Sequence, residues 1–512
     1  MRLARTWSVA LVGIEAHVVE VEASIGGGLP RTVMVGLPDA SLSESRDRCK
    51  AAVAALGRTW PQQAVTINLS PAALPKAGSH FDLAIALAVL GADVAVPEPA
   101  LEGVVMLGEL GLQGRVRPAR GVLPALLAAA EQGFTRALVP LSQVREARLV
   151  PGIRVVGVEG LRDAVALLRG DGYEEPPTPD PDPRQPDRRL DLADVVGQFE
   201  ARWALEVAAA GGHHMYFRGP PGVGKTLLAE RLPGILPDLG HEHSLEVSAI
   251  HSLAGRPLDD GLVVRPPYSD PHHSASVSAL VGGGSRIARP GAVSLAHRGV
   301  LFLDEAPEFS PRALEALRTP LEAGRIVLAR SVAHTAYPAR FQLILAANPC
   351  PCGKAGTPGA ECTCAPMAVR RYAERLSGPI LDRIDITLRM EPMSRTYLKA
   401  AGESGEPSEA VAERVMDARE RQLARLGPLG YAVNAEVPGP VLRRRVPLPG
   451  GIELLERAVS RGQLSARGVD RVLRVAWSIA DLAGEGVPTA DHLMAALGMR
   501  LGDFWGSDVR AG

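Results

Sequence analysis

The sequence predicts a multidomain protein whose central part belongs to the α/β class and is built on a parallel sheet. Between residues 191 and 393, apolar strand-like runs alternate with helical segments, which is typical of a parallel sheet flanked by helices. The first clear run, Met215–Arg218, is followed directly by a glycine-rich loop and then by the helical stretch Leu227–Leu232. A strand, a glycine-rich loop and a helix in that order are the setting of a phosphate-binding loop.

The composition is that of an ordinary globular protein. Apolar residues make up 46% of the 512 positions and charged residues 22%. The formal net charge of −1 gives no sign of a nucleic-acid partner, so any DNA contact has to come from local basic patches. The longest apolar stretch, Leu83–Ala92, is well short of the about 20 residues that a membrane span needs, and no secretory signal is visible. We therefore expect a cytoplasmic protein without a membrane partner.

One segment divides the chain. Residues 170–190 are dominated by Pro, Asp, Glu and Arg, and such a segment buries too little apolar surface to become ordered. We predict a disordered linker there, between an N-terminal domain of mixed strands and helices at 1–169 and the α/β core at 191–393. Residues 394–512 look helical. Near their end, apolar residues share one helix face: Val469, Val472, Leu473, Ala476, Ile479 and Ala480.

The phosphate-binding loop has the most specific motif. Residues 219–226 read GPPGVGKT and fit the pattern G-x-x-x-x-G-K-[ST]. Glycines in such a loop let backbone N–H groups surround phosphates, and the start of the next helix adds the positive end of its dipole. We expect the lysine to neutralise the outer phosphates of ATP and the threonine hydroxyl to bind Mg²⁺. The predicted nucleotide-binding residues are Gly219, Pro220, Pro221, Gly222, Val223, Gly224, Lys225 and Thr226.

Two carboxylates follow a second strand. Val300–Leu303 is an apolar run that ends in Asp304 and Glu305. On its own such a sequence is more often a helix cap, but a buried strand that delivers a carboxylate at its C-terminal end suits Mg²⁺ beside bound phosphates. We predict that Asp304 binds Mg²⁺, directly or through water, and that Glu305 orients or deprotonates the attacking water.

A third strand-like run, Leu343–Ala347, ends in Asn348. A neutral amide at this point can position the attacking water. An asparagine before a proline is otherwise a common turn residue. Beside the two motifs above, we expect Asn348 to be a polar sensor of the nucleotide.

Four of the five cysteines fall within fifteen residues, in the pattern C-x-C-x9-C-x-C. Four thiolates suit a structural zinc ion in tetrahedral geometry. An iron–sulfur cluster also accepts four thiolates, and a site without metal stays open because C-x-C is a less common spacing than C-x-x-C. We favour zinc as a brace for the loop that leaves the active site, bound by Cys350, Cys352, Cys362 and Cys364.

Several motifs together resemble one family. They are the phosphate-binding loop, FLDEAPEF at 302–309, LILAANPCPCG at 343–353, SGPILDRIDI at 377–386 and LSARGVDRVLRVAWSIADLAG at 464–484. From about residue 5 to 500, apart from the linker, the chain is similar to the magnesium-chelatase-like AAA+ ATPases of the ComM (YifB) group. The resemblance implies an AAA+ P-loop core with a four-cysteine insert at 350–364, and a helical lid at 394–512.

The resemblance also implies a hexameric ring in which a neighbouring subunit completes each ATP site. Arg383 matches the arginine finger of the family, and Arg467 matches the lid arginine that senses nucleotide. An arginine near the γ-phosphate offsets the charge that develops there. Without the family, each would be interpreted as an ordinary surface ion pair.

Residues 251–298 match a long insert of the family. Its Gly282–Gly284 run, with Arg286 and Arg289, suits a mobile basic loop lining the pore of a ring. The pair His272 and His273 suggests a metal only weakly, because no carboxylate lies at helical spacing from it. We expect the pair to have a structural or pore role.

The N-terminal domain resembles the ribosomal S5-like fold that Lon-type peptidase domains share. The segments SPAALPKAGSHFD at 70–82 and GELGLQGRV at 108–116 carry this likeness. Such peptidases need a serine activated by a lysine. Here the serine position holds His80 and the lysine position falls near Leu123, so we expect no peptidase activity.

Three functions compete. The ComM-like group is associated with DNA branch migration during natural transformation, which favours an ATP-driven ring helicase on single-stranded or branched DNA. The basic segments Arg443–Arg445 and Arg286 with Arg289 fit this weakly. The alternatives are a protein-remodelling ATPase and the motor subunit of a metal chelatase. Against the chelatase, those subunits lack the front domain, and no D-x-S-x-S motif is present.

Overall fold

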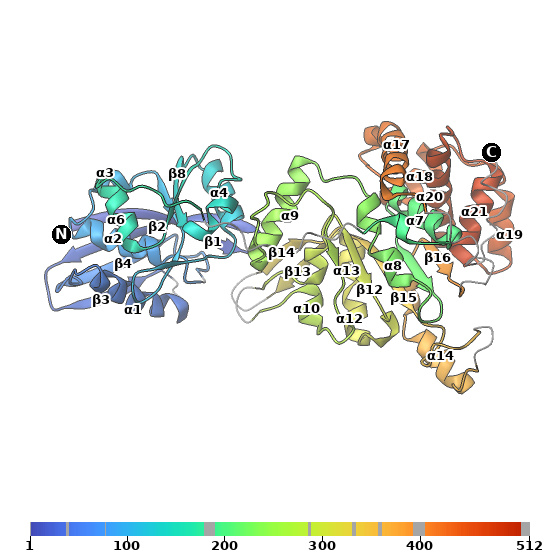
Figure 1. Cartoon of the computed structure of the whole chain (residues 1–512), viewed down its shortest axis with the longest axis horizontal. Helices are drawn as coiled ribbons and strands as arrows, with labels where there is room; N and C mark the ends of the chain where they lie inside the picture. Colours follow the sequence, from blue (N-terminus) through green and yellow to red (C-terminus); the bar gives the residue numbers. More distant parts are fainter. Residues whose placement is uncertain are drawn as a thin grey trace.

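The computed structural model describes most of the chain, in residues 2–36, 40–76, 78–178, 190–284, 288–329, 334–356, 361–392 and 405–502. Three parts follow one another along the long axis (Figure 1). An N-terminal sheet lies at one end, a parallel sheet lies in the centre, and a group of helices lies at the other end. None of the helices in these ranges has the length and apolar character to cross a membrane.

The N-terminal part is a seven-stranded mixed sheet with strand order β3-β4-β2-β1-β5-β8-β9. Valines and glutamates alternate along β2, and its alternate side chains point into the core, as a period of two predicts. Helix α2 is buried along almost its whole length, which explains why its sequence is apolar on every face. The elements are β1 (Arg2–Val12), β2 (Glu15–Gly26), β3 (Arg31–Val35), α1 (Ala40–Ala55), β4 (Ala64–Ser70), α2 (Asp82–Ala92), α3 (Glu98–Leu101), β5 (Val104–Met106), β6 (Glu109–Leu110), β7 (Val116–Arg117), α4 (Val122–Glu131), β8 (Arg136–Pro140), α5 (Val144–Ala147), β9 (Arg154–Val158) and α6 (Leu161–Arg169).

The segment after α6 contacts the N-terminal sheet, and the bounds of the linker stay a prediction. Tyr173 packs against the core of the N-terminal sheet, and its hydroxyl donates to the carbonyl of Gly157 at 2.7 Å. Arg148 also pairs with Glu175 at 2.9 Å. These two contacts join residues 173–175 to the N-terminal sheet, despite the polar composition of the segment. Residues 179–189 of the predicted linker lie outside the described ranges, and the likeness to S5-like and Lon-type domains stays a prediction.

The central part confirms the parallel α/β sheet. Its five strands lie in the order β11-β12-β15-β10-β16 and all pair in parallel. Strands β12 and β15 are buried along their whole length, as the continuous apolar runs in their sequences predict. The elements are α7 (Phe199–Gly211), β10 (Met215–Arg218), α8 (Lys225–Ala229), α9 (His241–Ala254), β11 (Tyr268–Ser269), α10 (Val277–Val281), α11 (Ala292–Leu295), β12 (Val300–Leu303), α12 (Pro311–Ala316), α13 (Arg318–Ala323), β13 (Arg325–Ala329), β14 (His334–Pro338), β15 (Gln342–Ala347), α14 (Pro366–Glu374), α15 (Gly378–Leu381) and β16 (Ile386–Arg389).

The C-terminal part is helical within its described range. Its helices are α17 (Ser408–Leu426), α18 (Gly439–Arg445), α19 (Glu453–Ser460), α20 (Ala466–Ala483) and α21 (Ala490–Leu501). The apolar face predicted for α20 is confirmed, because Val472, Leu473, Ala476, Ile479 and Ala480 are buried and Val469 packs against the same core. The role of these helices as a lid stays a prediction.

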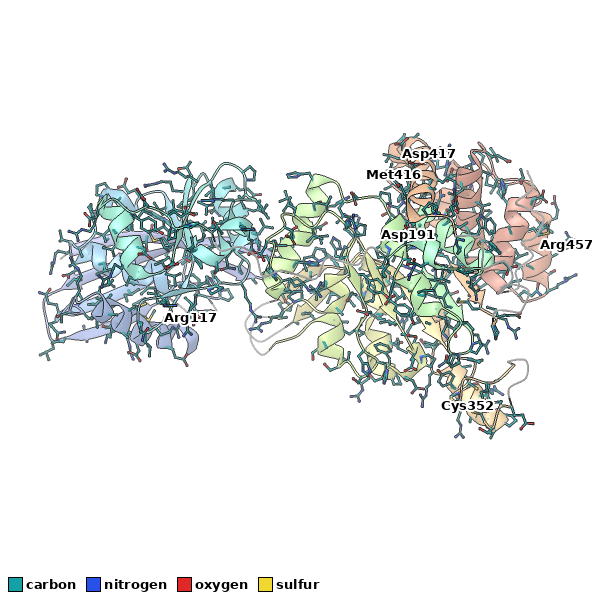
Figure 2. The ribbon with its side chains drawn as sticks, viewed as in Figure 1. Arg117, Asp191, Cys352, Met416, Asp417 and Arg457 are labelled. Carbon is teal, nitrogen blue, oxygen red and sulfur yellow. The ribbon has the colours of Figure 1, made fainter. Side chains whose placement is uncertain are left out.

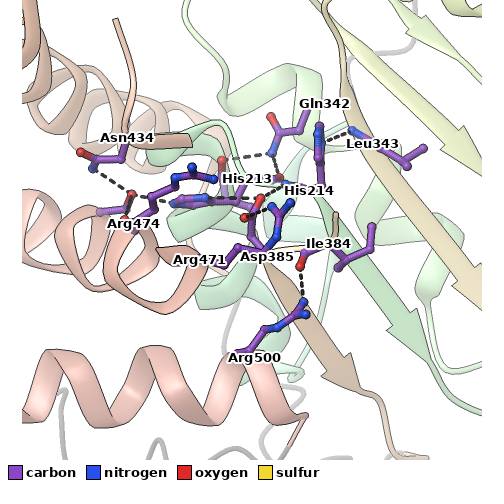
Figure 3. Close-up of polar contacts among 12 residues, drawn as sticks. His213, His214, Gln342, Leu343, Ile384, Asp385, Asn434, Arg471, Arg474 and Arg500 are labelled. Carbon is purple, nitrogen blue, oxygen red and sulfur yellow. Dashed lines mark hydrogen bonds and ion pairs between the residues drawn. The ribbon is translucent and has the colours of Figure 1, made fainter. Parts of the chain in front are cut away.

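A buried polar network joins α20 to the central sheet (Figure 3). Asp385, directly before β16, accepts hydrogen bonds from Arg471 at 2.6 Å and from the backbone N–H of His214 at 3.0 Å. His213 contacts the hydroxyl of Ser478 in α20 at 2.7 Å. Burial alone would raise the pKa of Asp385, but Arg471 and His213 lower it well below its ordinary value. The guanidinium of Arg471 therefore compensates the buried carboxylate of Asp385.

The N-terminal part contacts the central part at α9. The buried carboxylate of Glu146 accepts hydrogen bonds from the backbone N–H of Leu123 at 3.1 Å and from the hydroxyl of Ser252. The backbone N–H of Gly121 donates to the carbonyl of Ser252 at 3.2 Å. Gly121 has a φ of +73°, and a Cβ there would lie 2.9 Å from Leu253, so this contact requires glycine.

Candidate functional site

The phosphate-binding loop leaves the C-terminal end of β10. The N–H of Gly219 donates to the carbonyl of Ala347 at 3.2 Å, which fixes the loop to the end of β15. A Cβ at position 219 would lie 2.4 Å from the carbonyl oxygen of Met390, so only glycine fits there. Gly222 and Gly224 have φ values of +79° and +90°, in the left-handed region that favours glycine. These glycines give the loop its compact turn before α8 begins at Lys225.

Lys225 lies inside this loop. Its ammonium donates to the carbonyl oxygens of Gly219 at 2.7 Å and Pro220 at 2.9 Å, and to Oδ1 of Asn348 at 3.0 Å. Burial lowers the pKa of Lys225, and the nearby carboxylates of Asp304 and Glu305 oppose that shift. The structure therefore brings together two residues that the sequence predicted separately, Lys225 and Asn348.

Thr226 and Asp304 are also in contact. The hydroxyl of Thr226 donates to Oδ2 of Asp304 at 2.9 Å. The second oxygen, Oδ1, accepts from the backbone N–H of Glu305 at 2.8 Å. A hydroxyl and a carboxylate this close fit Mg²⁺, which binds hard oxygen ligands and keeps several waters. These two residues would hold the ion, beside the loop that would hold the phosphates.

Glu305 contacts a residue whose part in the site the sequence did not reveal. Oε2 of Glu305 lies 3.4 Å from Nδ1 of His273. The sequence-based expectation concerned only a carboxylate at helical spacing from the His272–His273 pair. The carboxylate comes instead from the neighbouring strand, because β11 and β12 pair in parallel. The two-residue length of β11 left no periodic pattern in the sequence by which to find it.

The two predicted arginines lie near each other. Arg383 is 8% exposed, donates to the carbonyl of Pro379 and pairs with Glu322. Arg467, in the first turn of α20, is largely exposed and lies 3.5 Å from the carboxylate of Asp382. Burial and the nearby positive charges of Arg318 and Arg467 lower the pKa of Arg383. In the described ranges, neither arginine has a hydrogen bond or ion pair with residues 219–226.

The four cysteines form one cluster. Their sulfur atoms all lie within 4.8 Å of one another. Cys350 and Cys352 are separated by 3.3 Å, Cys352 and Cys362 by 3.6 Å, and Cys350 and Cys362 by 3.7 Å. Tetrahedral zinc with Zn–S bonds of about 2.3 Å requires S···S distances near about 3.8 Å, so the arrangement fits that ion. The backbone N–H of Lys354 lowers the pKa of Cys352 to about 6, whereas the pKa of Cys362 is raised to about 11, because the lowering by the backbone N–H of Cys364 is outweighed by burial and by the sulfur atoms of Cys352 and Cys350.

The cysteine cluster projects from the central part beside α14, where Cys352 is labelled (Figure 2). Its base touches the phosphate-binding loop, because a Cβ at Gly353 would lie 2.7 Å from the ring of Pro221. The N–H of Ala355 donates to the sulfur of Cys350 at 3.3 Å. Residues 357–360, between the two cysteine pairs, lie outside the described ranges.

Comparisons with known proteins identify the family. The family described as magnesium chelatase, subunit ChlI, matches residues 191–398, its C-terminal model matches 405–500, and a further model for subunit ChlI of Mg-chelatase matches 21–143. The competence protein ComM of Haemophilus influenzae is 38% identical over 98% of each chain. The YifB protein of Escherichia coli is 40% identical over 98% of this chain and 97% of its own. The protein Rv2897c of Mycobacterium tuberculosis is 54% identical over 98% of this chain and 99% of its own.

This chain belongs to the magnesium-chelatase-like ComM/YifB family. The family resemblance drawn from the motifs is thereby confirmed, and its relatives match all three parts of the chain. The magnesium-chelatase 38 kDa subunit of Rhodobacter capsulatus is 25% identical over 331 residues, which are 60% of this chain and 85% of its own. The expectation that chelatase motor subunits lack the front domain stays a prediction.

Proposed function

We propose that this ComM/YifB protein is an ATP-hydrolysing motor that acts on DNA as a ring. The observation that carries the ATPase part is the meeting of three strand ends at one edge of the central sheet. There Lys225 contacts Asn348 at 3.0 Å and Thr226 contacts Asp304 at 2.9 Å. This is the arrangement that a nucleotide with Mg²⁺ requires, with a cation for the phosphates beside oxygen ligands for the metal.

Each residue then has a role. Backbone N–H groups of residues 219–226 and the Lys225 ammonium bind the phosphates, and Thr226 and Asp304 hold Mg²⁺. Glu305 orients or deprotonates the attacking water, and Asn348 senses the phosphate that leaves. The cysteine cluster holds zinc and braces the loop against Pro221, without taking part in the chemistry.

The proposal of a ring of subunits is supported by the two arginines. Arg467 is largely exposed and lies 3.5 Å from Asp382, whereas Arg383 is buried near it and paired with Glu322. Among the described residues, neither has a hydrogen bond or ion pair with the phosphate-binding loop of its own chain. An arginine finger that cannot serve its own site can serve that of a neighbour. We therefore propose that both arginines complete the ATP site of the adjacent subunit in a hexamer.

DNA as the substrate is supported by the family rather than by the bulk charge. One relative is named a competence protein, and the motifs resemble the group associated with branch migration. In the basic segment Arg443–Arg445, Arg443 is paired with Asp470, so it is less available to bind a DNA phosphate. Arg289 lies next to the glycine run at 282–284, whereas Arg286 lies outside the described ranges.

The test is the ATPase rate of the purified chain with different additions. Single-stranded or forked DNA should raise turnover, whereas a porphyrin or an unfolded protein should not. DNA binding with a non-hydrolysable ATP analogue should weaken with salt, by about 0.7 per phosphate contact on a log–log plot for single strands. Stimulation by unfolded protein alone would establish a remodelling ATPase instead, and stimulation by a porphyrin with its partner subunits would establish a chelatase motor.

A further inference from the structure

The thiols of the cysteine cluster differ in how accessible they are to small molecules in solution. Cys350 is buried, Cys352 and Cys364 are partly exposed, and Cys362 is exposed. The sulfur atoms of Cys352 and Cys362 are 3.6 Å apart, in the projection where Cys352 is labelled in Figure 2. Oxidation of a cysteine depends on the exposure of its sulfur, so an oxidant reaches Cys352 and Cys362 before Cys350.

The geometry of the cluster also favours Cys352 and Cys362 as partners in a disulfide. The bond needs a sulfur–sulfur distance of about 2.05 Å and a torsion near about 90°. The sulfur atoms of Cys350 and Cys352 are 3.3 Å apart, but a bond between them would close a ring over one intervening residue, which restricts that torsion. Cys352 and Cys362 come from different C-x-C pairs, and the longer chain between them places no such limit on the bond.

The oxidation of this pair balances with a peroxide as the oxidant. The sulfur of Cys352 attacks one oxygen of hydrogen peroxide, the O–O bond breaks, and the products are a sulfenic acid and one water. The sulfur of Cys362 then attacks the sulfenic sulfur, the S–O bond breaks, and a second water leaves. The two thiols together give up two protons and two electrons, which reduce the peroxide to water. A dithiol reductant reverses the change.

A disulfide here changes the ligand set of the cluster and the position of its chain. Only two thiolates then remain, and a closed zinc site requires four ligands, so the disulfide and a bound zinc ion exclude each other. The two sulfur atoms must also approach each other by about 1.5 Å, from 3.6 Å to the length of the bond. This approach displaces Cys352 together with Gly353, the residue next to it.

Gly353 contacts the phosphate-binding loop. Its N–H donates to the carbonyl of Cys350 at 2.9 Å, which closes a tight turn. A Cβ at position 353 would lie 2.7 Å from the ring of Pro221, so the two residues are in close contact. The carbonyl before that ring, on Pro220, accepts from the Lys225 ammonium at 2.9 Å. A shift of Gly353 against Pro221 therefore displaces a hydrogen-bond acceptor of the lysine that would hold the phosphates.

The other end of the same turn also leads to this lysine. Cys350 follows Asn348 by two residues, and Oδ1 of Asn348 accepts from the Lys225 ammonium at 3.0 Å. Cys350 is buried, and its sulfur accepts from the N–H of Ala355 at 3.3 Å. Lys225 is therefore hydrogen-bonded to both segments that meet at the cysteine cluster.

We propose that Cys352 and Cys362 are a redox modification site, in which a peroxide forms a reversible disulfide that weakens ATP binding through the contact of the turn with Pro221. The proposal rests on the proposed function, because it assumes that residues 219–226 bind ATP. It makes the nucleotide affinity of the motor depend on the oxidant around it, whereas the cluster takes no part in the hydrolysis itself.

The experiment titrates a fluorescent ATP analogue into the full-length protein before and after treatment with hydrogen peroxide, and again after reduction with dithiothreitol. Peptide mass analysis identifies the disulfide. We expect the bond between Cys352 and Cys362 to form and the Kd of the analogue to rise about tenfold. That rise corresponds to about 1.4 kcal/mol, close to the net contribution of one hydrogen bond to a charged group. Dithiothreitol should restore the starting Kd.

Three variants separate the disulfide from other effects of the peroxide. Cys362→Ser removes one partner and should keep the same Kd with and without peroxide. Cys49→Ala removes the fifth cysteine, which is buried in the N-terminal part, and should respond as the wild type does. Pro221→Ala removes the ring that Gly353 contacts, so its disulfide should form while its Kd changes less than that of the wild type.

An unchanged Kd in oxidised wild type that carries the disulfide overturns the proposal. So does a bond between other cysteines in its place, a peroxide response that persists in Cys362→Ser, or a full response in Pro221→Ala. Reduced wild type that binds no ATP overturns the proposed function instead, and mass analysis distinguishes this case because it detects the disulfide without nucleotide.

Discussion

Arg471 of α20 lies 2.6 Å from Asp385, directly before β16, with side chains 15% and 2% exposed. Removing one partner of a buried ion pair leaves an uncompensated charge and costs about 3–5 kcal/mol. We expect Asp385→Ala to lower the free energy of unfolding by that amount in urea denaturation. Removing the exposed carboxylate of the Arg370–Glu374 pair with Glu374→Ala should change little. Equal effects of the two variants would show that the buried pair contributes no more to the free energy of unfolding than the exposed pair does.

Substitutions at Lys225 and Glu305 should separate ATP binding from ATP hydrolysis. Lys225→Ala should abolish ATP binding, because it removes the cation that holds the outer phosphates. Glu305→Gln should bind ATP as the wild type does and lose hydrolysis, because an amide does not accept the proton of water. Nucleotide binding by fluorescence and phosphate release measure the two steps. Near-normal turnover in Glu305→Gln would contradict the role given to Glu305.

Arg383 should act on the ATP of a neighbouring subunit. Arg383→Ala should keep its affinity for nucleotide and lose turnover by about 10³ or more, as other arginine fingers do. Mixing Arg383→Ala subunits with Lys225→Ala subunits should restore part of the activity, since some interfaces then combine an intact loop with an intact arginine. Mixed rings that show no activity at any ratio would argue against a shared site.

The cysteine cluster should bind about one zinc ion per chain. Elemental analysis of protein purified without a metal-binding tag measures it, and Cys352→Ser should lower the content. Binding should weaken as pH falls, because protons compete for the thiolates. Less than about a tenth of an equivalent of zinc or iron, where a structural site would hold one ion, would mean that the four cysteines are plain thiols.

His214 should make the fold sensitive to mild acid. Burial lowers the pKa of His214 to about 4, and its Nδ1 accepts a hydrogen bond from the backbone N–H of Leu343 at 3.0 Å. As the pH falls, His214 is therefore protonated in the unfolded chain at a higher pH than in the folded chain. Stability is complete above about pH 6.5 and falls, by up to about 1.4 kcal/mol per unit, as the pH drops toward 4.

Urea denaturation between pH 7.5 and 4.5 tests this. His214→Asn keeps an acceptor but cannot be protonated, so its curve should be flatter than that of the wild type. Some dependence should remain, because burial also lowers the pKa of His251 to about 4. Identical curves for both proteins would exclude His214 as a source of acid sensitivity.

The sequence predicted the parts of the fold that local patterns encode. Strand β12 and the residues after it could be found because a buried parallel strand is a continuous apolar run, and its end carries function. The contacts between motifs could not be predicted from the sequence. Asp385 meets Arg471 only because α20 packs beside β16, and no local pattern records a pairing across 86 positions. His273 was missed for the same reason, since its partner lies on a different strand.

Pro221 and Gly353 have a consequence for how this chain can change over time. Gly353 has a φ of +77°, and any side chain there would enter the pyrrolidine ring of Pro221. A variant that enlarges position 353 therefore survives only with a smaller residue at 221, inside the nucleotide-binding motif. The two positions should therefore co-vary among ComM/YifB sequences. Residue changes in the cysteine loop are then limited by the residues that the nucleotide-binding motif tolerates at position 221.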